Sequence, residues 1–361
     1  MRILLSALSF QPDFGGPARS VPQLATALAD LGMDVGLWAP DGSATQSPLL
    51  KGATRLHLLD GPAEAAWRAF GKVDVLHDNG IWRPHHLKLM TLAETQGAAR
   101  ILSARGMLTP WAFNHKPVRK RLAWWTYQRR SVNRASALHA TAEAEAEGFR
   151  SLGLRPPVRI IPNGISLPPW DEVETARKTG PADRTCLYMS RLNPTKGIPL
   201  LLEAWARLRP EGWRLHIAGP DENGYKADLD NVVKRLGLGP EVRFLGAVEG
   251  GDKLAELARA DVLVLPTYTE NFGIVVAEAL AHGCPVVTTH GAPWRILETE
   301  SCGWWVPVSV DGIAGALQEA MSKGRAELRA MGDRGRACVD RHFSWSDIAR
   351  RSIELYEVAA G

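Results

Sequence analysis

Residues 261–280 read Asp261-Val-Leu-Val-Leu265-Pro-Thr-Tyr-Thr-Glu270-Asn-Phe-Gly273-Ile-Val-Val-Ala-Glu278-Ala-Leu280, and they predict a strand, a loop and a helix in that order. The short apolar run ending at Leu265 has the composition of a buried strand. Polar residues follow it as a loop, and the predicted helix begins near Gly273. A strand followed by a helix in this way is the repeating unit of an α/β sheet.

The same alternation of short strands and amphipathic helices extends over almost the whole chain, in two series. Strands of the first series are predicted at 2–8, 34–38, 73–77, 100–103, 137–141 and 158–161. Strands of the second are predicted at 185–189, 214–218, 242–245, 261–265 and 285–289. Between the series lie the turn signal Asn163-Gly164, then Pro168-Pro169 and a polar stretch to Asp183. We therefore predict two α/β domains, residues 1–167 and 168–345, followed by a last amphipathic helix.

The composition suits a protein of two globular domains. The chain has 361 residues, of which 45% are hydrophobic and 23% are charged, which excludes general disorder. We find no apolar stretch of ~18 residues and no secretory signal, so a cytoplasmic protein is predicted. The four cysteines lie far apart without a C-x-x-C pair, which argues against a zinc site or a disulfide scaffold. Residues 1–165 hold 20 Lys+Arg and 12 Asp+Glu (+8), which leaves 23 and 27 (−4) for the remainder.

A second motif, Tyr188-Met-Ser-Arg191-Leu-Asn-Pro-Thr-Lys196-Gly197, also lies between a predicted strand and a predicted helix. Arg191 and Lys196 can converge on one diphosphate across this loop, Arg as a planar fork and Lys as a point charge. They would stabilise the negative charge that builds on a leaving nucleotide.

The helix of the first motif offers two further binding groups. Glu278 lies among apolar residues, where an ionised carboxylate is costly unless a partner such as a ribose diol binds it. Backbone N–H groups near Gly273, at the helix start, offer a site for phosphate. Hexose, diphosphate and ribose could thus bind at three successive positions along one end of the helix. The alternative is that Glu278 is a surface residue after an ordinary capping loop.

These two motifs resemble those of the retaining glycosyltransferase family 4, the glycosyl transferases of group 1, which have the GT-B fold. The segments Phe14-Gly15-Gly16-Pro17, Ile161-Pro162-Asn163-Gly164 and Phe343-Ser344-Trp345 match the family's loop, hinge and last-helix signatures. The resemblance therefore runs over nearly the whole chain. It implies two Rossmann-like, doubly wound domains that face each other across a cleft. It also implies that a C-terminal helix over residues 346–361 crosses back to the first domain.

The resemblance also implies roles for individual residues. Glu270 would bind hydroxyls of the transferred sugar and Glu278 the ribose, while Arg191 and Lys196 would hold the diphosphate. Backbone N–H groups at Gly15 and Gly16 would approach the phosphates from the other domain. The implied donor site comprises Gly15, Gly16, Arg191, Lys196, Asn271, Phe272, Gly273 and Glu278. Arg191, Lys196, Glu270, His77 and Arg105 are the residues assigned to catalysis.

The N-terminal half is expected to receive the acceptor. His77 is predicted to end a strand and Arg105 to follow one, so both should point into the cleft. Many relatives have a histidine at the position of Arg105, so here a permanent cation replaces an imidazole. The R-G-M-L-x-x-W-A pattern from Arg105 resembles a branch of the family involved in exopolysaccharide and lipopolysaccharide assembly. The alternative for His77 is a histidine satisfied by its structural neighbours.

Two segments bear on substrate and partner. His290-Gly291-Ala292-Pro293-Trp294 departs from the family's Gly-Gly turn, so the donor hexose is not named, and Trp294 is either a packing residue or a wall for the acceptor. Residues 95–142 contain nine Lys+Arg and no Asp or Glu, and seven of the nine lie in 115–134 beside Trp124, Trp125 and Tyr127. Such a segment suits peripheral contact with an anionic membrane or a lipid diphosphate acceptor. The alternative is a solvated face with its aromatic residues packed inward.

Other patterns point to no further chemistry. Asp228-Leu-Asp230 lies in a polar helical run, and His85-His86 lacks companion metal ligands and is expected to be exposed. A dinucleotide-binding G-x-G-x-x-G after the first strand and a P-loop are both missing from the sequence. Nucleic acid is not expected as a partner, because the C-terminal half is acidic and no recognition motif accompanies the basic segment.

We therefore expect a cytoplasmic retaining hexosyltransferase that needs no metal or other cofactor. Whether it is also peripheral on the inner face of the membrane depends on which of the two interpretations of the basic segment holds. It would move a hexose from a nucleoside diphosphate sugar to a glycan or lipid-linked acceptor. Two alternatives of another class are a non-hydrolysing nucleotide-sugar epimerase and an inactive nucleotide-sugar binding subunit.

Overall fold

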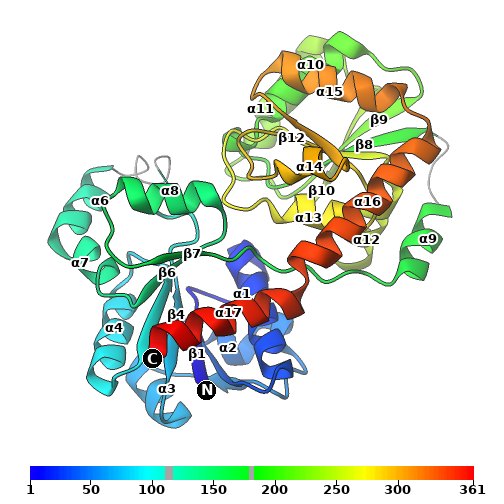
Figure 1. Cartoon of the computed structure of the whole chain (residues 1–361). Helices are drawn as coiled ribbons and strands as arrows, with labels where there is room; N and C mark the ends of the chain where they lie inside the picture. The colour runs from blue at the N-terminus through cyan, green and yellow to red at the C-terminus, as the bar shows by residue number, and fades with distance from the viewer. Residues whose placement is uncertain (110–116, 179–182) are drawn as a thin grey trace. The chain divides into compact units, whose positions relative to one another are not determined.

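The structure is a computed structural model that describes residues 1–109, 117–178 and 183–361. The chain divides into two compact units (Figure 1). Unit 1 comprises Met1–Gly164 and Trp345–Gly361, and unit 2 comprises Ile165–Ser344. The boundaries expected from the sequence, after residues 167 and 345, lie three residues and one residue from these positions. Among the described residues, no helix is long and apolar enough to cross a membrane.

Unit 1 is built on a seven-stranded parallel sheet in the order β3-β2-β1-β4-β5-β6-β7. The order reverses between β1 and β4, as in doubly wound nucleotide-binding sheets. The strands are β1 (Arg2–Ser6), β2 (Asp34–Trp38), β3 (His57–Leu59), β4 (Val75–Asn79), β5 (Ala99–Ser103), β6 (Ala137–Ala140) and β7 (Val158–Ile160). The described helices are α1 (Gly16–Asp30), α2 (Ser43–Gln46), α3 (Ala63–Phe70), α4 (Pro84–Gln96), α6 (Pro117–Ala123), the π-helical turn η3 (Trp124–Gln128), α7 (Arg129–Val132), α8 (Glu143–Ser151) and α17 (Trp345–Ala360), with the short turns η1 (Pro12–Phe14) and η2 (Pro48–Leu50).

Each face of this sheet has its own apolar core, because successive side chains of a strand point to opposite faces. Ile3 and Leu5 of β1 lie in one core together with residues of α1 and α17. Leu4 lies in the other core, with residues of α3 and α4. Val21, Leu24, Ala25 and Leu28 of α1 are buried in the first core.

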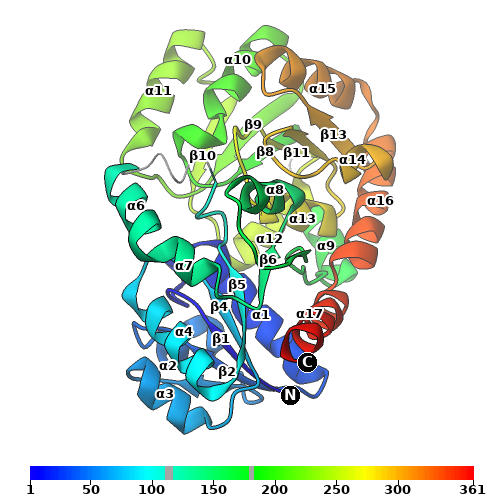
Figure 2. The same ribbon diagram turned by 60° about the vertical axis from the view of Figure 1, so that its left-hand side comes forward.

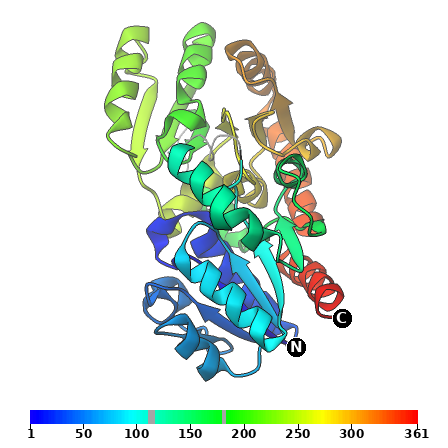
Figure 3. The same ribbon diagram turned by 90° about the vertical axis from the view of Figure 1, so that its left-hand side faces the viewer.

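The last helix, α17, belongs to unit 1 although it follows unit 2 in the chain. It packs against α1 and β5, and Figures 1, 2 and 3 all show the two termini close together on this unit. The chain leaves unit 1 at Gly164, where a Cβ atom would lie 2.3 Å from the Trp345 indole. The expected return of the last helix to the first domain is therefore confirmed.

Unit 2 repeats the same topology with a six-stranded parallel sheet in the order β10-β9-β8-β11-β12-β13. Its strands are β8 (Arg184–Met189), β9 (Trp213–Ala218), β10 (Val242–Gly246), β11 (Val262–Leu265), β12 (Val286–Thr289) and β13 (Gly303–Val306). Its helices are α9 (Trp170–Lys178), the 3-10 turn η4 (Pro194–Lys196), α10 (Ile198–Leu208), α11 (Tyr225–Leu236), α12 (Gly250–Arg259), α13 (Ile274–Ala281), α14 (Ile296–Thr299), α15 (Val310–Ser322) and α16 (Arg325–Phe343). Here the strand order reverses between β8 and β11.

The prediction of two Rossmann-like α/β domains is confirmed, and every predicted strand is present within a few residues. Two strands were missed, β3 and β13, which are the three- and four-residue edge strands of the two sheets. Edge strands are half-exposed and short, so they lack the continuous apolar run that marks a central parallel strand.

Candidate functional site

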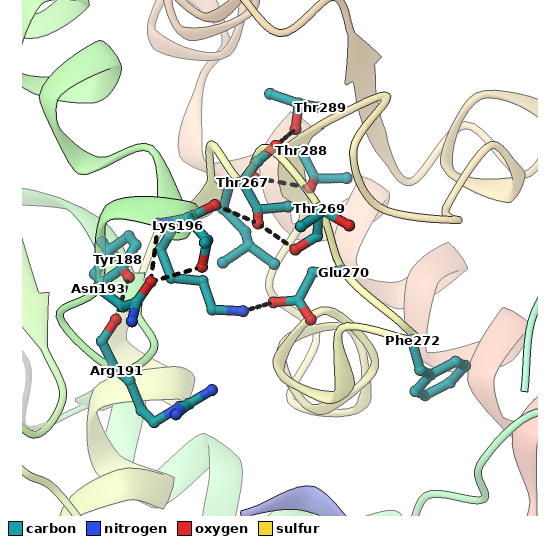
Figure 4. Close-up of polar contacts among 12 residues, drawn as sticks. Tyr188, Arg191, Asn193, Lys196, Thr267, Thr269, Glu270, Phe272, Thr288 and Thr289 are labelled. Carbon is teal, nitrogen blue, oxygen red and sulfur yellow. Dashed lines mark hydrogen bonds and ion pairs between the residues drawn. The ribbon is translucent and has the colours of Figure 1, made fainter. Parts of the chain in front are cut away.

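The two motifs of the sequence meet at the switch point of the sheet in unit 2. Arg191 and Lys196 follow β8, and Glu270 follows β11, which is paired with β8. The carboxyl ends of parallel strands lie at one edge of a sheet, and ligands of such sheets bind where the strand order reverses. Figure 4 shows these side chains on the loops that leave this edge.

Backbone contacts fix the two loops against each other. The carbonyl of Thr195 accepts hydrogen bonds from the backbone N–H of Tyr268, at 2.9 Å, and from the Thr267 hydroxyl, at 3.1 Å. Gly197 has φ 67°, and a Cβ atom there would lie 2.0 Å from the carbonyl oxygen of Pro266. A side chain at this position would push the loops apart, so the glycine sets the approach of Lys196 to Glu270.

Lys196 and Glu270 form an ion pair through Nζ and Oε1 (Figure 4). Their side chains are only 10% and 15% exposed, so the pair is largely removed from water. An ammonium in such surroundings acts on a nearby anion through a lower effective dielectric than bulk water provides. The geometry gives a cation and a carboxylate acceptor side by side at the strand ends.

Arg191 occupies a more open position in the same loop. Its Nη1 pairs with Oε2 of Glu222 at 3.0 Å, and its side chain is 59% exposed. The Asn193 amide donates to the same carboxylate oxygen at 3.0 Å, while its own Oδ1 accepts from the N–H of Thr195 at 2.9 Å. The guanidinium is thus held near the loop by one carboxylate but retains donors that face solvent.

The start of α13 is held by an aromatic cluster. Gly273 is the N-cap residue, with the left-handed φ of 76°. The carbonyl of Phe272 accepts a hydrogen bond of 2.5 Å from the indole Nε1 of Trp294, which is fully buried. Phe272 and Trp294 pack with ring centroids 5.2 Å apart. Trp294 is therefore a packing residue that positions the helix start, the first of its two expected roles.

Glu278 does not lie in the wholly apolar surroundings expected from its neighbours in sequence. Its side chain is 23% exposed, and Oε1 pairs with Nζ of Lys253 at 2.6 Å. Lys253 lies on α12, which packs beside α13, so the sequence around Glu278 does not indicate this contact. The carboxylate already has a cation as its partner. The expectation that Glu278 is an unpaired buried acid in need of a ligand is therefore wrong.

In unit 1 the glycines of the first loop lie at the start of α1. Gly15 is the N-cap residue with φ 85°, and Gly16 opens the helix. A Cβ atom at either position would meet nothing within 4 Å, so no neighbouring atom of the described chain requires a glycine there. The loop that carries them follows β1, which lies at the switch point of this sheet.

His77 lies within β4 and not at its end, which corrects its expected placement. Its ring is 1% exposed, with Nδ1 2.7 Å from the Tyr356 hydroxyl of α17 and Nε2 3.2 Å from Nδ1 of His139. His139 in turn donates from Nε2 to the carbonyl of Ile161 at 2.7 Å. Burial, with His139 and Arg105 nearby, holds the pKa of His77 well below its usual value, and burial lowers the pKa of His139 to about 3. Both rings are neutral and satisfied by neighbours in unit 1.

Arg105 follows β5 and has an unusual backbone, with φ 52°. Its Nε and Nη2 donate to Oδ1 of Asn79 at 2.9 and 2.7 Å, and its Nη1 donates to Oδ1 of Asn163 at 2.9 Å. Burial lowers the pKa of Arg105 to about 10, which leaves it protonated at neutral pH. The rest of the motif that begins at Arg105 extends into residues 110–116, outside the described part of the chain.

Two family models match the chain, one in each unit. "Glycosyl transferase 4-like domain" matches residues 15–164, and "Glycosyl transferases group 1" matches residues 172–337. The chain belongs to the group 1 glycosyltransferases. The predicted family is therefore confirmed.

Individual relatives agree with this assignment. An uncharacterized glycosyltransferase of Methanocaldococcus jannaschii, MJ1607, is 34% identical over 219 residues, a match that spans 56% of this chain and about half, 54%, of that protein. The phosphatidyl-myo-inositol mannosyltransferase of Mycolicibacterium smegmatis is 28% identical over 372 residues, 96% of this chain and 91% of that protein. Among solved structures, Anabaena HepE in complex with UDP and glucose has a TM-score of 0.78 at 21% identity, covering 99% of this chain and 100% of HepE. That likeness concerns the fold.

The other residues singled out in the sequence are His85-His86 and Asp228-Leu-Asp230. His86 is buried, not exposed, and its Nδ1 lies 2.7 Å from Oδ1 of Asp78. Asp228 and Asp230 are exposed on α11, as expected for a solvated helix. Glu222 and Lys253, the partners of Arg191 and Glu278, were missed. Neither belongs to a motif, and only the position of Glu222 in the loop after β9 could have suggested it.

Proposed function

We propose that this chain is a retaining hexosyltransferase that moves a hexose from a nucleoside diphosphate sugar to a glycan or lipid-linked acceptor, without a metal or other cofactor. The observation that carries the proposal is the Lys196–Glu270 pair at the switch point of unit 2, beside Arg191 and the start of α13. Lys196 and Arg191 provide cations for a diphosphate, and Glu270 provides a carboxylate for sugar hydroxyls, within one set of loops. HepE, a structural neighbour, was solved with UDP and glucose, which supports a nucleotide sugar as the donor in kind.

In this proposal the residues of unit 2 act on the donor together. Lys196 leaves Glu270 to bind the diphosphate, and Arg191 adds a planar fork of donors. Glu270 then accepts hydrogen bonds from the hexose, while Glu278 accepts from the ribose with the carboxylate oxygen that does not pair with Lys253. Asn271, Phe272 and Gly273 line the helix start, where backbone N–H groups face the phosphates. Charge that builds on the leaving diphosphate is stabilised by these groups.

We further propose a front-face transfer with retention of configuration. A donor phosphate oxygen takes the proton of the acceptor hydroxyl, so no nucleophilic carboxylate is required. The acceptor is received by unit 1. His77 is buried and neutral, so within this proposal it holds α17 to the sheet through Tyr356.

Donor binding is tested by thermal shift with UDP-, GDP- and ADP-sugars. A ligand that binds only the folded protein raises its stability by about 2.7 kcal/mol at 100 times its Kd. We expect one nucleotide class to raise the melting temperature by several degrees and the others to act only weakly. No rise with any of them would overturn the proposal. Incubation of the bound donor alone, followed by NMR, separates transfer from epimerisation, because an epimerase converts the donor without an acceptor.

We also propose that unit 1 contacts an anionic membrane through an amphipathic surface formed by α6, η3 and α7. Val118, Leu122 and Trp125, at positions i, i+4 and i+7, are 79%, 67% and 73% exposed and form one apolar stripe. Trp124 and Val132 are buried on the opposite side of the same helical segment. Exposed arginines lie within this segment and just after it: Arg119, Arg121, Arg130 and Arg134. An apolar stripe bordered by cations suits insertion at the headgroup level of anionic lipid.

Flotation with vesicles of phosphatidylglycerol and phosphatidylcholine tests this surface. We expect binding to vesicles with the anionic lipid, and a loss of about tenfold or more in the double variant Leu122→Ser, Trp125→Ser, since each buried apolar side chain contributes about 1.5–3 kcal/mol. Binding to the anionic vesicles should be abolished by charge reversal of Arg119, Lys120, Arg121, Arg129 and Arg130. Val358, which is 72% exposed on α17, provides the control: Val358→Ser should bind as the unmodified chain does. Equal flotation of all variants would contradict the membrane contact.

A further inference from the structure

Two arginines at opposite ends of β5 have very different partners. Arg100, 3% exposed, forms an ion pair of 2.7 Å with Asp78, which is fully buried. Although burial opposes it, His86 and Arg100 hold the pKa of Asp78 well below its usual value. Arg105 beyond the other end of β5 has only the neutral side-chain oxygens of Asn79 and Asn163. Within the described residues, no carboxylate lies within ion-pairing distance of it.

The acid that acts on Arg105 from nearby is engaged elsewhere. Glu145 raises the pKa of Arg105 by its charge, but it is 4% exposed and its oxygens accept hydrogen bonds from other groups. Oε1 accepts from the N–H of Gly106 at 2.7 Å, and Oε2 from the N–H of Thr141 at 2.9 Å. His77 and His139 are neutral and supply no anion. Arg105 is only partly buried, but a cation that is partly removed from water without a paired anion is still unfavourable for the protein alone, and a bound anion would offset that cost.

The backbone around Arg105 is strained as well. Arg105 and Gly106 have φ 52° and 77°, and in the loop after the neighbouring strand β4, Gly80 and Trp82 have φ 133° and 77°. A positive φ costs free energy at a non-glycine residue and persists only where the surrounding structure imposes it. Two such residues, Trp82 and Arg105, thus occupy adjacent loops at the carboxyl edge of the sheet. Strain of this kind collects at ligand sites.

The side chain retains donors for such a partner. A guanidinium has five N–H groups, and the contacts with Asn79 and Asn163 use three of them. One N–H remains on each of Nη1 and Nη2, and a guanidinium can bind a phosphate through two N–H groups. We propose that Arg105 binds a phosphate group carried by the acceptor, so that this chain selects acceptors with a phosphoryl group next to the sugar or lipid. This proposal rests on the proposed function, and it makes Arg105 a specificity residue for the acceptor.

The phosphate could belong to a soluble sugar phosphate or to a lipid headgroup. The structure links Arg105 to the amphipathic surface through its neighbouring loop. The Trp82 ring lies 6.3 Å from that of Trp124 in η3, and Nζ of Lys120 lies 5.8 Å from the centre of the Trp82 ring. A lipid bound at the amphipathic surface would therefore have its headgroup on the same side of unit 1 as Arg105. The experiment has one arm for each source.

The test measures the rise in melting temperature of the full chain with inorganic phosphate, at ionic strength held constant with chloride, and with short-chain phosphatidic acid against short-chain phosphatidylcholine. Because phosphate also fits the diphosphate site of unit 2, the proteins compared carry Lys196→Ala, alone and together with Arg105→Gln, Arg105→Lys or Arg68→Gln. Arg68 is exposed on α3 and serves as the matched control.

We expect Lys196→Ala to retain a phosphate-dependent rise, and the added Arg105→Gln to weaken the apparent affinity by about tenfold or more, the usual effect of losing hydrogen bonds to a charged group. Arg105→Lys keeps the cation without the fork and should be intermediate, which also guards against misfolding of the glutamine variant. Arg68→Gln should change nothing. A response to phosphatidic acid alone assigns the group to a lipid, and a response to both probes assigns it to phosphate in general. An equal response with and without Arg105 would overturn the inference. A failure of nucleotide sugars to bind would instead overturn the proposed function, since the phosphate arm does not depend on them.

Discussion

Replacement of Lys196 by alanine is expected to lower the rate of sugar transfer by about 10²-fold or more, the usual effect of removing one group that stabilises transition-state charge. The ammonium is 10% exposed and lies at the strand ends against Glu270, so its interaction with a departing diphosphate is poorly screened by water. Because charge on the diphosphate grows as the glycosidic bond breaks, the loss should fall mainly on kcat and less on KM. Release of nucleoside diphosphate, measured with the donor found by thermal shift, gives both constants.

Lys226→Ala is the matched control for this variant. Lys226 is on α11 of the same unit and pairs with Asp230 at 2.7 Å, with both side chains about half exposed. Exposed pairs of this kind contribute about 0–1 kcal/mol, so its activity should stay within about twofold of that of the unmodified chain. A melting temperature measured on both variants separates a local effect from unfolding. Near-normal turnover of Lys196→Ala would remove the basis of the proposed site.

The loops of unit 2 could be predicted from the sequence because their chemistry lies directly after two central strands. Apolar runs at 185–189 and 261–265 mark buried parallel strands, and the loops after such strands lie at one edge of the sheet. Lys196 and Glu270 could therefore be placed near each other before their contact was known. The glycine that sets their distance, Gly197, is visible in the sequence, but its approach to Pro266 is a tertiary contact.

The partners of these residues could not be predicted, since each comes from a different element. Glu222 lies after β9 and Lys253 lies on α12, and neither has a pattern that separates it from the many exposed charges of the chain.

For His77, in contrast, the sequence predicted an accessible position that the structure does not show. A polar residue near a strand end suggested a site, whereas β4 extends two residues further and α17 covers the ring with Tyr356. Burial by an element nearly 280 positions away leaves no local signal.

Replacement of Trp294 by alanine is expected to lower the stability of unit 2 by about 3–5 kcal/mol, as for other large aromatic residues in a core. The indole is 1% exposed and packs with Phe272 and Phe343, at centroid distances of 5.2 and 5.1 Å. Its removal leaves a cavity and also an unpaired carbonyl at Phe272, immediately before the helix start that carries the proposed phosphate site. For a unit of this size the melting temperature should fall by roughly 10 °C, which calorimetry can measure.

Two variants show whether this effect arises from packing. Trp294→Phe keeps most of the apolar volume but loses the N–H donor, so it should cost less than the alanine variant, about 1–3 kcal/mol for the unpaired carbonyl. Trp125→Ala removes the same side chain from a position that is 73% exposed and should change stability by no more than about 0.5 kcal/mol. If Trp294→Ala instead melts like the unmodified chain while its acceptor KM rises, Trp294 is a wall of the acceptor site. The packing role follows from the 1% exposure of the ring, so a large loss of stability is the expected result.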